Sequence, residues 1–360
     1  MRTPRFLCLC LITGLSTAGA PLAGAGDNAG LKAIHDRIEQ GEIPNVHSVL
    51  VAQNGQTIAE WYFPGVDEQR SHSLGTVSFG PDTLHDIRSA SKSIVSLLFG
   101  IAVAQGAVSS LDTPVLDYFP EYKDLQTAER RKIRLKDLLS MTSGLHWDER
   151  TYPYTDARNS ETAMDLAEDR LRHILSQPIE APAGTRWTYN GGDVALIAEV
   201  IARATKRPIE AFARETLFAP MGISSFEWTK DRNGIPIAAS GLRMRPRDML
   251  KIGLLMLDHG RFNGRQIVPS SWIDAVTAPS AVVDKDDSCP TKYGYFWWVF
   301  PDCTPSFYGA IGNGGQRIWL VPSKKLVIVT TAGLYNDERQ RLIRRITQGV
   351  TEAVEGPPQP

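Results

Sequence analysis

Three short runs of β-branched and aromatic residues near the C-terminus constrain the fold of this 360-residue chain most strongly. They span residues 307–311, 316–321 and 326–332, and only four residues separate each run from the next. A parallel connection needs a crossover of about a dozen residues or more, so these short connections allow only antiparallel pairing. The sequence therefore predicts an antiparallel meander near the C-terminus.

The N-terminal part of the chain predicts a hairpin of its own. Residues 48–52 and 57–62 are apolar runs on either side of Asn54-Gly55, and Asn-Gly between such runs is a strong hairpin signal. An amphipathic helix is predicted before it, over residues 31–40, and a charged helix near the other end of the chain, over residues 338–352. Both ends of the chain thus supply strands and a helix.

The region between the two groups of strands is mainly helical in character. Helices are expected over residues 91–104, 134–140, 163–175, 194–204 and 246–258. The simplest architecture is of the α+β class, with an antiparallel sheet built from both chain ends, flanking terminal helices and an inserted helical region. We expect a sheet domain of residues 26–88 plus 205–360 and a mostly helical domain of residues 89–204.

The charge balance excludes several classes of function. There are 39 Lys and Arg residues against 40 Asp and Glu residues, a net charge of −1, and 42% of the residues are hydrophobic. Binding to nucleic acid or to an anionic membrane needs a basic excess or patch, which this balance does not provide. We therefore expect a globular protein with an ample core and a small-molecule partner. The sequence does not predict an oligomeric state.

The segment from Met1 to Ala25 is typical of a secretory signal peptide. Arg2 and Arg5 precede an apolar stretch over residues 6–15, and small residues follow up to Ala25. The stretch is too short to span a bilayer, so a permanent membrane anchor is the weaker interpretation. Cleavage after Ala20 would leave Pro21 first, so we expect cleavage after Ala25 and a periplasmic or secreted protein.

Export would leave two cysteines in the mature chain, Cys289 and Cys303. Cys8 and Cys10 lie in the predicted signal peptide and would be removed with it. An oxidising compartment favours a disulfide between the two remaining thiols. The alternative is a pair of unpaired buried thiols.

The feature that carries chemistry is the Ser-Ala-Ser-Lys motif of residues 89–92. The predicted helix that follows is apolar nearly all round, and hence buried. Lys92 would lie in its first turn, where desolvation and the positive end of the helix dipole disfavour the ammonium form. Ser89 lies one turn away on the same face, so a neutral or hydrogen-bonded Lys92 amine can take its proton. In the alternative, Ser89 is an N-cap and Lys92 extends to water.

A Gly-rich loop over residues 182–193 supplies a second candidate. A phenol beside a lysine ammonium has its ionised form favoured, so Tyr189 in this loop is a candidate proton relay. The alternative packs Tyr189 beside Trp187. Asp193, at the end of the loop, is predicted to be the N-cap of the following helix.

Several other catalytic motifs are missing from the sequence. No two histidines have the spacing of metal ligands, and there is no Cys-x-x-Cys, phosphate-binding loop or Gly-x-Gly-x-x-Gly after a strand. The Gly-x-Ser-x-Gly nucleophile elbow is also missing. His85 and His146 remain candidates for a Ser-His-Asp triad, although a structural role is the simpler interpretation of each. We predict no metal and no organic cofactor.

Four blocks in this order resemble those of the serine β-lactamase and penicillin-binding-protein superfamily. They are Ser-x-x-Lys-Ser at 89–93, Leu-Leu-Ser-Met-Thr-Ser-Gly-Leu at 138–145, the loop at 184–193 and Gly-Asn-Gly-Gly-Gln at 312–316. The chain is most similar to the class C β-lactamase-like esterases and the 6-aminohexanoate-dimer hydrolase branch, over nearly all of the mature chain. The resemblance implies a β-lactamase/transpeptidase-like fold and an acyl-serine mechanism. Ser89 would be the nucleophile, Lys92 its base, and Tyr189 the second base or proton relay.

Two positions depart from the pattern of the β-lactam-active members. Those members have Tyr-x-Asn in the tyrosine block and a Lys or His at the start of the late strand, where this chain has Gly191 and Asn313. A Lys or His there helps to hold a substrate carboxylate, whereas Asn313 carries no charge. We therefore expect short acyl esters or uncharged amides to be preferred over β-lactams, although Arg317 could supply the missing charge from another direction.

The glycine-rich late block is also interpreted by analogy with the family. Small glycines allow a substrate to approach the strand closely, and a tight β-turn is a compatible alternative. The backbone N–H groups of Ser89 and Gln316 would form the oxyanion hole. The expected substrate-binding residues are Asn190, Gly191, Asn313, Gly314 and Gly315.

The sequence thus predicts an exported serine hydrolase that cleaves an ester or amide through an acyl-enzyme on Ser89. One alternative is a β-lactamase or D,D-peptidase acting on β-lactams or peptidoglycan peptides. Another, from a different class, is a non-catalytic ligand-binding member of the fold. The joint presence of Ser, Lys and Tyr argues against this last alternative.

Overall fold

The computed structural model describes residues 28–284 and 289–356. The predicted signal peptide, with Cys8 and Cys10, lies outside the described residues. Within the described residues, no helix has both the length and the apolar character needed to cross a bilayer.

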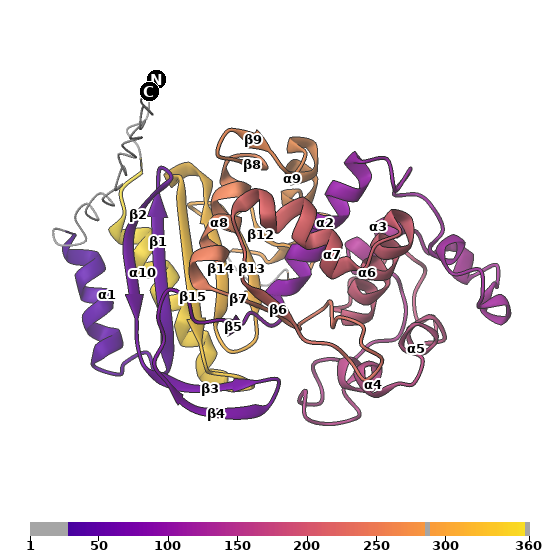
Figure 1. Ribbon diagram of the computed structural model, residues 1–360, viewed down its shortest axis with the longest axis horizontal. Helices are drawn as coiled ribbons and strands as arrows, with labels where there is room; N and C mark the ends of the chain where they lie inside the picture. The colour runs from indigo at the N-terminus through magenta and orange to yellow at the C-terminus, as the bar shows by residue number, and fades with distance from the viewer. Residues whose placement is uncertain (1–27, 285–288, 357–360) are drawn as a thin grey trace, which may run out of the picture.

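An eight-stranded antiparallel sheet forms the centre of the molecule (Figure 1). The C-terminal meander consists of β13 (Phe307–Gly312), β14 (Gln316–Val321) and β15 (Leu326–Ala332). It continues directly into the N-terminal hairpin of β1 (Val46–Gln53) and β2 (Gln56–Tyr62), because β15 pairs with β1. The predicted meander, the predicted hairpin and the α+β class are confirmed.

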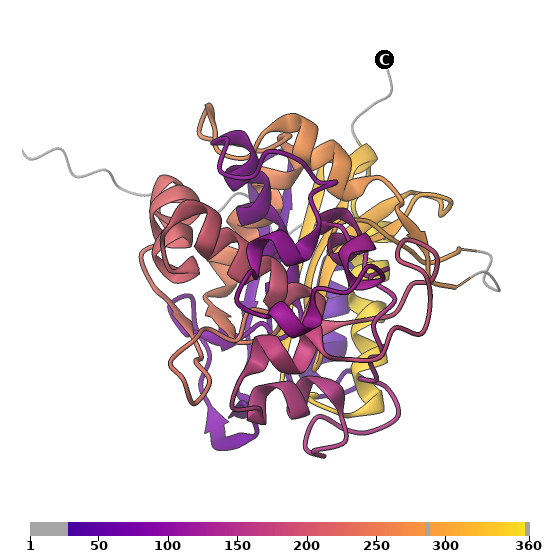
Figure 2. The same cartoon turned by 90° about the vertical axis from the view of Figure 1, so that its right-hand side faces the viewer.

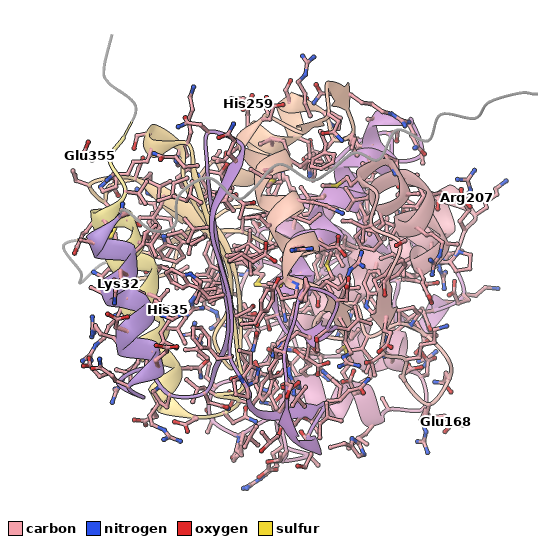
Figure 3. The ribbon with its side chains drawn as sticks, turned by 60° about the vertical axis from the view of Figure 1, so that its left-hand side comes forward. Lys32, His35, Glu168, Arg207, His259 and Glu355 are labelled. Atoms are coloured by element: carbon pink, nitrogen blue, oxygen red, sulfur yellow. A yellow bond between two sulfur atoms is a disulfide. The ribbon has the colours of Figure 1, made fainter. Side chains whose placement is uncertain are left out.

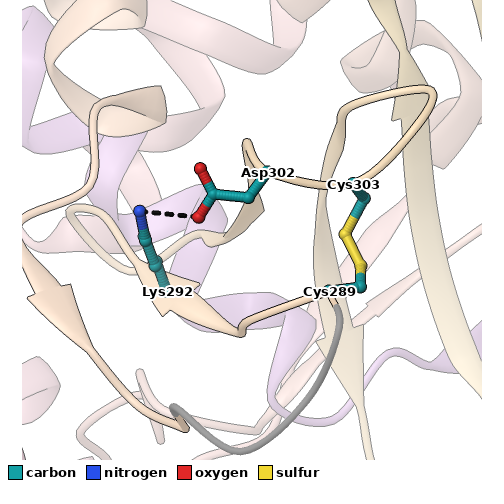
Figure 4. The surroundings of a disulfide bond; sticks show 4 residues. All are labelled: Cys289, Lys292, Asp302 and Cys303. Atoms are coloured by element: carbon teal, nitrogen blue, oxygen red, sulfur yellow. Dashed lines mark ion pairs between the residues drawn. A yellow bond between two sulfur atoms is a disulfide. The ribbon is translucent and has the colours of Figure 1, made fainter.

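The far edge of the sheet was not predicted from the sequence. It is made of three very short strands, β10 (Ala281–Val282), β11 (Lys292–Tyr293) and β12 (Trp298–Phe300). A disulfide joins Cys289 to Cys303 beside them, with 4.9 Å between the two Cα atoms (Figure 4). An ion pair of 2.8 Å between Lys292 and Asp302 lies in the same hairpin.

Both faces of the sheet are covered by helices. On one face, α1 (Ala29–Glu39) and α10 (Arg344–Ala353) pack together over β1 and β15. Helix α1 turns Leu31, Ile34 and Ile38 towards the core, which follows from its spacing of apolar residues. Its polar positions include Lys32 and His35, which Figure 3 places at the edge of the molecule.

The opposite face carries α2 (Ala90–Ala104) and α8 (Pro246–Leu257). A Cβ atom at Gly253 of α8 would lie only 2.3 Å from Val327 of β15, so glycine allows this helix to approach the sheet closely. Successive residues of β1 point to opposite faces of the sheet, and helices cover both faces. Val49 and Leu50 are therefore both buried, but they belong to different apolar clusters.

The remaining helices form a group beside α2, seen face-on in Figure 2. They are α3 (Leu135–Leu139), α4 (Ser160–Leu166), α5 (Arg170–Leu175), α6 (Gly191–Thr205) and α7 (Ile209–Ala213). Helix α2 is buried from Ala90 to Ala102 because it packs against α6 on one side and against β13 and α9 (Ser270–Thr277) on others.

Small sheets and turns complete the structure. A hairpin of β3 (Gly65–Gln69) and β4 (His72–Val77) was not predicted, nor was the small sheet that holds the segment before Ser89. This sheet has the order β5-β7-β6, from β5 (His85–Asp86), β6 (Phe226–Trp228) and β7 (Leu242–Met244), and β8 (Arg261–Phe262) pairs with β9 (Arg265–Gln266).

Predicted helix boundaries are wrong in three places. The helix expected over residues 338–352 is a 3-10 helix over Glu338–Ile343 followed by α10. The helix expected over residues 163–175 is broken into α4 and α5, because Ala167 is extended and the Asp169 side chain caps a new helix by accepting from the N–H of Arg172. The N-cap of α6 is Asn190 rather than Asp193. The Asn190 side chain accepts from the N–H of Asp193, which places Asp193 in the first turn.

Candidate active site

The motif of residues 89–92 lies where α2 begins, beneath the end of β13. Arg88, directly before it, has a left-handed φ of 49°. A Cβ atom on Gly312 would lie 2.2 Å from the carbonyl oxygen of Ile87, so only glycine lets β13 lie against this turn. The turn and the strand together fix the position of Ser89.

Lys92 is buried against Ser89. Its Nζ donates to Ser89 Oγ at 3.1 Å and to the carbonyl oxygen of Ala239 at 3.1 Å, and the residue is 1% exposed. Ser89 makes no side-chain capping bond to the helix. The structure therefore shows neither part of the alternative in which Ser89 caps the helix and Lys92 extends to water.

Tyr189 completes a cluster with these two residues. Lys92 Nζ lies 4.9 Å from the centroid of the Tyr189 ring, and Tyr189 lines a cavity together with Ser89. Its ring stacks on Trp298 at 5.8 Å between centroids and lies 6.2 Å from Trp187. Burial raises the pKa of Tyr189, and the nearby Lys92 charge counteracts part of this effect. The packing beside Trp187 and the contact with the motif therefore occur together.

The charge state expected for Lys92 is wrong. Burial alone would lower the pKa of Lys92, but the electrostatic interactions with Tyr189, Glu161 and Glu149 outweigh it and raise this pKa above its usual range. The ammonium form is thus favoured in the resting protein. This charge state could not be predicted from the helix alone, because the two glutamates come from other parts of the chain.

Glu149 and Glu161 are site residues that carry no signal in the sequence. Glu149 accepts from Trp147 Nε1 at 2.5 Å and from the N–H of Gly191 at 2.6 Å with one oxygen, and from the Tyr154 hydroxyl at 2.9 Å with the other. Glu161 lies 3.5 Å from Lys92 Nζ. Neither glutamate belongs to a recognisable motif, and both lie far from Lys92 along the chain. Only the fold brings these carboxyl groups to the lysine.

Two cavities open beside Ser89. One, of about 170 Å³, is lined by Tyr154, Glu161 and Asn313 among others, and the second, of about 460 Å³, by Tyr189, Asn313 and Arg317 among others. Ser89 and Asn313 line both. The Asn313 amide is held by Asn336, to which it donates at 2.7 Å. A substrate bound between the two cavities would therefore contact Ser89 and Asn313.

The structure places Gln316 away from these cavities. Gln316 is fully buried, and its side chain donates to the carbonyl oxygen of Ala332 at 2.6 Å. The N–H of Gly314 is also engaged, because it donates to Gln340 at 3.0 Å. Gly315 has a φ of 104°, a conformation that favours glycine. Among the residues expected to bind substrate in this loop, Asn313 is the one that lines both cavities.

The other two expected substrate-binding residues have structural partners. The Asn190 side chain caps α6, and the residue is 1% exposed. The N–H of Gly191 donates to Glu149. The structure thus brings Ser89, Lys92, Tyr189 and Asn313 together and turns Asn190 and Gly191 towards α6 and the glutamate.

Arg317 places a positive charge in the cleft. It is 7% exposed, and its Nε and Nη1 atoms have no hydrogen-bond partner among the described residues. Burial and the nearby Arg344 lower the pKa of Arg317 to about 10. Both arginines line the larger cavity beside Ser89, so a substrate carboxylate could find a cation there although Asn313 carries none.

The candidate histidines make their contacts elsewhere. His146 pairs with Glu180 at 2.6 Å on the surface. His85 is buried and hydrogen-bonds to His47 at 2.7 Å, in a cluster that also contains Asp67 and has metal-ligating residue types. The facing ring nitrogens of His47 and His85 are at hydrogen-bond distance. The sequence did not predict this cluster, because its three residues come from β1, β3 and β5.

Comparison with known proteins agrees with this geometry. The family model described as Beta-lactamase matches residues 32–350. The chain belongs to the beta-lactamase family. It is therefore a serine hydrolase of the amidase or esterase kind, with the β-lactamase/transpeptidase-like fold.

The relatives within the beta-lactamase family are distant. The chain is 24% identical to the 6-aminohexanoate-dimer hydrolase of Paenarthrobacter ureafaciens, over 78% of this chain and 70% of that protein. It is 25% identical to a putative penicillin-binding protein of Bacillus subtilis, over 55% of this chain and 45% of that protein.

Solved structures of the family share the fold at low identity. A putative 6-aminohexanoate-dimer hydrolase from Bacillus anthracis has a TM-score of 0.72 at 20% identity, covering 89% of this chain and 83% of its own. A class C β-lactamase from Rhodobacter sphaeroides has a TM-score of 0.65 at 19% identity, and the match covers 91% of this chain and 100% of that protein.

Proposed function

We propose that this protein hydrolyses a small ester or amide through an acyl-enzyme on Ser89. The observation that carries the proposal is the contact of Ser89 Oγ with the buried Lys92 Nζ at 3.1 Å, next to Tyr189 and two cavities. A serine hydroxyl is a weak nucleophile, and an adjacent base activates it.

The proposed reaction has two halves. In the first, Lys92 takes the hydroxyl proton as Ser89 Oγ attacks the carbonyl carbon, and Tyr189 relays a proton to the departing alcohol or amine. In the second, water attacks the acyl-enzyme, the same groups accept its proton, and Ser89 recovers its hydrogen. Tyr189 can serve both halves because its ring lies 4.9 Å from Lys92 Nζ and it lines the larger cavity together with Ser89.

We propose that the oxyanion hole consists of the N–H groups of Ser89 and Asn313, in place of Gln316. Neither N–H donates to an acceptor among the described residues. Both residues line the two cavities, so both groups are available to a substrate carbonyl. Such preorganised donors stabilise the charge that develops on the carbonyl oxygen.

A substrate that bears a carboxylate is the second candidate, and Arg317 favours it. Its buried guanidinium has two nitrogens without a partner among the described residues and lines the cleft. A β-lactam or a peptide C-terminus would place its carboxylate within the same cleft. Neutral esters and amides remain the first candidate because the position of the missing Lys or His is occupied by Asn313.

We also propose that the protein is periplasmic or secreted, on the basis of the segment from Met1 to Ala25. Mass spectrometry of the N-terminus of the exported protein would test this. A mature chain that begins at Gly26 supports the proposal, whereas an exported protein that retains this segment contradicts it.

Turnover tests the catalytic proposal. The wild type is compared with Ser89→Ala and with the surface variant Ser110→Ala on a p-nitrophenyl ester, a linear amide and a chromogenic cephalosporin. We expect Ser89→Ala to lose all three activities and Ser110→Ala to keep them. Undiminished hydrolysis by Ser89→Ala would refute the role of Ser89, and a wild type with no activity on any ester or amide would favour a ligand-binding protein.

A further inference from the structure

The absence of a side chain at Gly191 creates the space for two carboxyl groups. A Cβ atom at this position would lie 2.9 Å from Glu149 Oε1 and 2.9 Å from Glu161 Oε2. The resembling β-lactam-active proteins have an asparagine at this position. In this chain the two glutamates therefore occupy the space in which that amide side chain would begin.

The two carboxyl groups are buried side by side. Glu149 and Glu161 are only 6% and 3% exposed, and both approach the same side of Gly191. Glu161 Oε2 is buried and accepts from no N–H or hydroxyl of the described residues. Two buried carboxylates this close repel each other, so the ionisation of both is disfavoured.

The remaining carboxyl oxygens are held by donors. Glu149 accepts from Trp147, Gly191 and Tyr154, and the other oxygen of Glu161 accepts from the Ser240 hydroxyl. The pair is thus held in place on several sides. Its one oxygen without such a donor, Glu161 Oε2, faces Lys92 Nζ at 3.5 Å.

Lys92 connects this pair to the nucleophile. Its Nζ donates to Ser89 Oγ and to the carbonyl oxygen of Ala239, which leaves its third hydrogen for the direction of Glu161. A buried ammonium cannot accept the Ser89 proton until it has lost one of its own. A proton acceptor next to Lys92 is therefore required, and Glu161 Oε2 is suitably placed.

We propose that the Glu149–Glu161 pair accepts a proton from the Lys92 ammonium and so generates the amine that activates Ser89. This inference rests on the proposed function. The two glutamates act on the substrate only through Lys92, so we class them as positioning residues.

The proton balance closes over one acylation. A proton passes from Lys92 Nζ to Glu161 Oε2, and the resulting amine takes the hydroxyl proton as Ser89 Oγ bonds to the carbonyl carbon. The bond to the leaving group breaks, and the leaving group receives a proton from Lys92 through Tyr189. The pair then returns its proton to Lys92, so the net transfer is from Ser89 to the leaving group.

The pair predicts a specific pH dependence. Burial and the charge of Glu161 raise the pKa of Glu149 to about 7. The fully ionised pair is the better acceptor, so kcat/KM should rise with pH through about 7. Among the described residues, the charged and titratable groups that face the pair are Lys92, Tyr189, Tyr154, Tyr293, Arg70, Asp165 and Asp193.

The test compares Glu149→Gln and Glu161→Gln with the wild type on a p-nitrophenyl ester from about pH 5 to about pH 9. Glu168→Gln is the matched control, because Glu168 is exposed on the surface near α4 (Figure 3). We expect kcat to fall roughly 10²-fold or more in the first two variants with little change in KM, and the rise near pH 7 to be lost. Glu168→Gln should keep the wild-type kcat and the rise in activity near pH 7.

Gly191→Ala provides a second test that alters no ionisable group. Alanine suits the first turn of a helix, but its Cβ would displace both carboxyl groups. We expect the rise near pH 7 to move and kcat to fall, whereas thermal unfolding reports separately on folding. If a glutamine variant fails to fold, Gly191→Ala still tests whether the pair accepts the Lys92 proton.

The outcomes separate the inference from the proposed function. If wild type and all variants keep the same kcat and the same rise near pH 7, the pair is not the proton acceptor, although the Ser89 mechanism stands. If the wild type neither turns over esters nor labels with a fluorophosphonate at Ser89, the proposed function itself fails.

Discussion

The apolar core between β1 and β15 and the polar core around Lys92 are both buried, but they are stabilised differently. Leu50 and Val329 pair across β1 and β15 within an apolar cluster. Lys92 is equally buried, yet its surroundings are Glu161, Tyr189 and a carbonyl oxygen. An apolar contact depends on shape and area, whereas a buried charge depends on its partners and on pH. The two regions should therefore respond differently to the same kind of change.

Removing the amine should have the largest effect on activity. Lys92→Ala and Tyr189→Phe are expected to retain the fold and to lower kcat/KM by roughly 10²- to 10⁴-fold, as for other general acid-base groups. Steady-state kinetics with circular dichroism as the folding control measures this. Activity within a few-fold of wild type in Lys92→Ala would contradict the account of the polar core.

A cavity in the apolar core should act on stability alone. Leu50→Ala is expected to lower the free energy of unfolding by about 2–5 kcal/mol, because it removes buried methyl groups beside Val329. The loss should be the same at every pH, and kcat of the folded protein should not change. Urea unfolding at several pH values measures this loss of stability. A loss that varies with pH would show that the apolar core does not differ from the polar core in its response to pH.

The polar core should make stability depend on pH. The pKa of Glu149 is raised from 4.5 to about 7 in the folded protein, so the folded state retains a proton that the unfolded chain releases. Its contribution to stability is present below about pH 4.5 and is lost as pH rises through the raised pKa.

Glu149→Gln should remove this part of the decline, because the amide does not titrate. Urea unfolding of wild type, Glu149→Gln and the surface control Glu168→Gln across this range provides the comparison. Parallel curves for wild type and Glu149→Gln would show that Glu149 does not titrate in this way.

The disulfide should stabilise the edge of the sheet. The bridge between Cys289 and Cys303 closes a short loop, for which the chain-entropy model gives a stabilisation of roughly 3 kcal/mol. Thiol titration of the exported protein under denaturing, non-reducing conditions should find no free thiol. Two free thiols per chain would refute the bridge.

The smallest expected effect concerns substrate charge. Arg317→Met should lower kcat/KM for an ester with a carboxylate by about 10- to 100-fold relative to a neutral ester of the same size, since one charge-assisted hydrogen bond is worth about 1.5–3 kcal/mol. Arg214→Met, on an exposed helix end, is the control. An equal change for both esters would show that Arg317 does not select by charge.

Local patterns predicted much of the fold. The four-residue connections allowed only an antiparallel meander, and β14 and β15 have the predicted bounds. Ser89 and Lys92 were found because a helix places residues three apart on one face. The break between α4 and α5 was missed because it depends on a local cap at Asp169 that competes with an otherwise helical pattern.

The rest of the site could not be predicted because it is non-local. Glu149 and Glu161 reach Lys92 only after the loop before α4 folds against α6, and neither has a periodic or motif signal. The Lys92 charge was misjudged for the same reason, since desolvation is local to the helix and the compensating charges are not. The backbone N–H of Gln316 was assigned to the oxyanion hole by analogy, and Gln316 does not line either of the two cavities beside Ser89.

The most direct test of the central claim is to trap the acyl-enzyme. Wild type and Ser89→Ala are mixed with an ester, quenched in acid during turnover, digested and examined by mass spectrometry. The account predicts the acyl mass on the peptide that contains Ser89 in the wild type and no acyl mass in Ser89→Ala. Acylation of another residue such as Ser143, or turnover by Ser89→Ala at the wild-type rate, would contradict it.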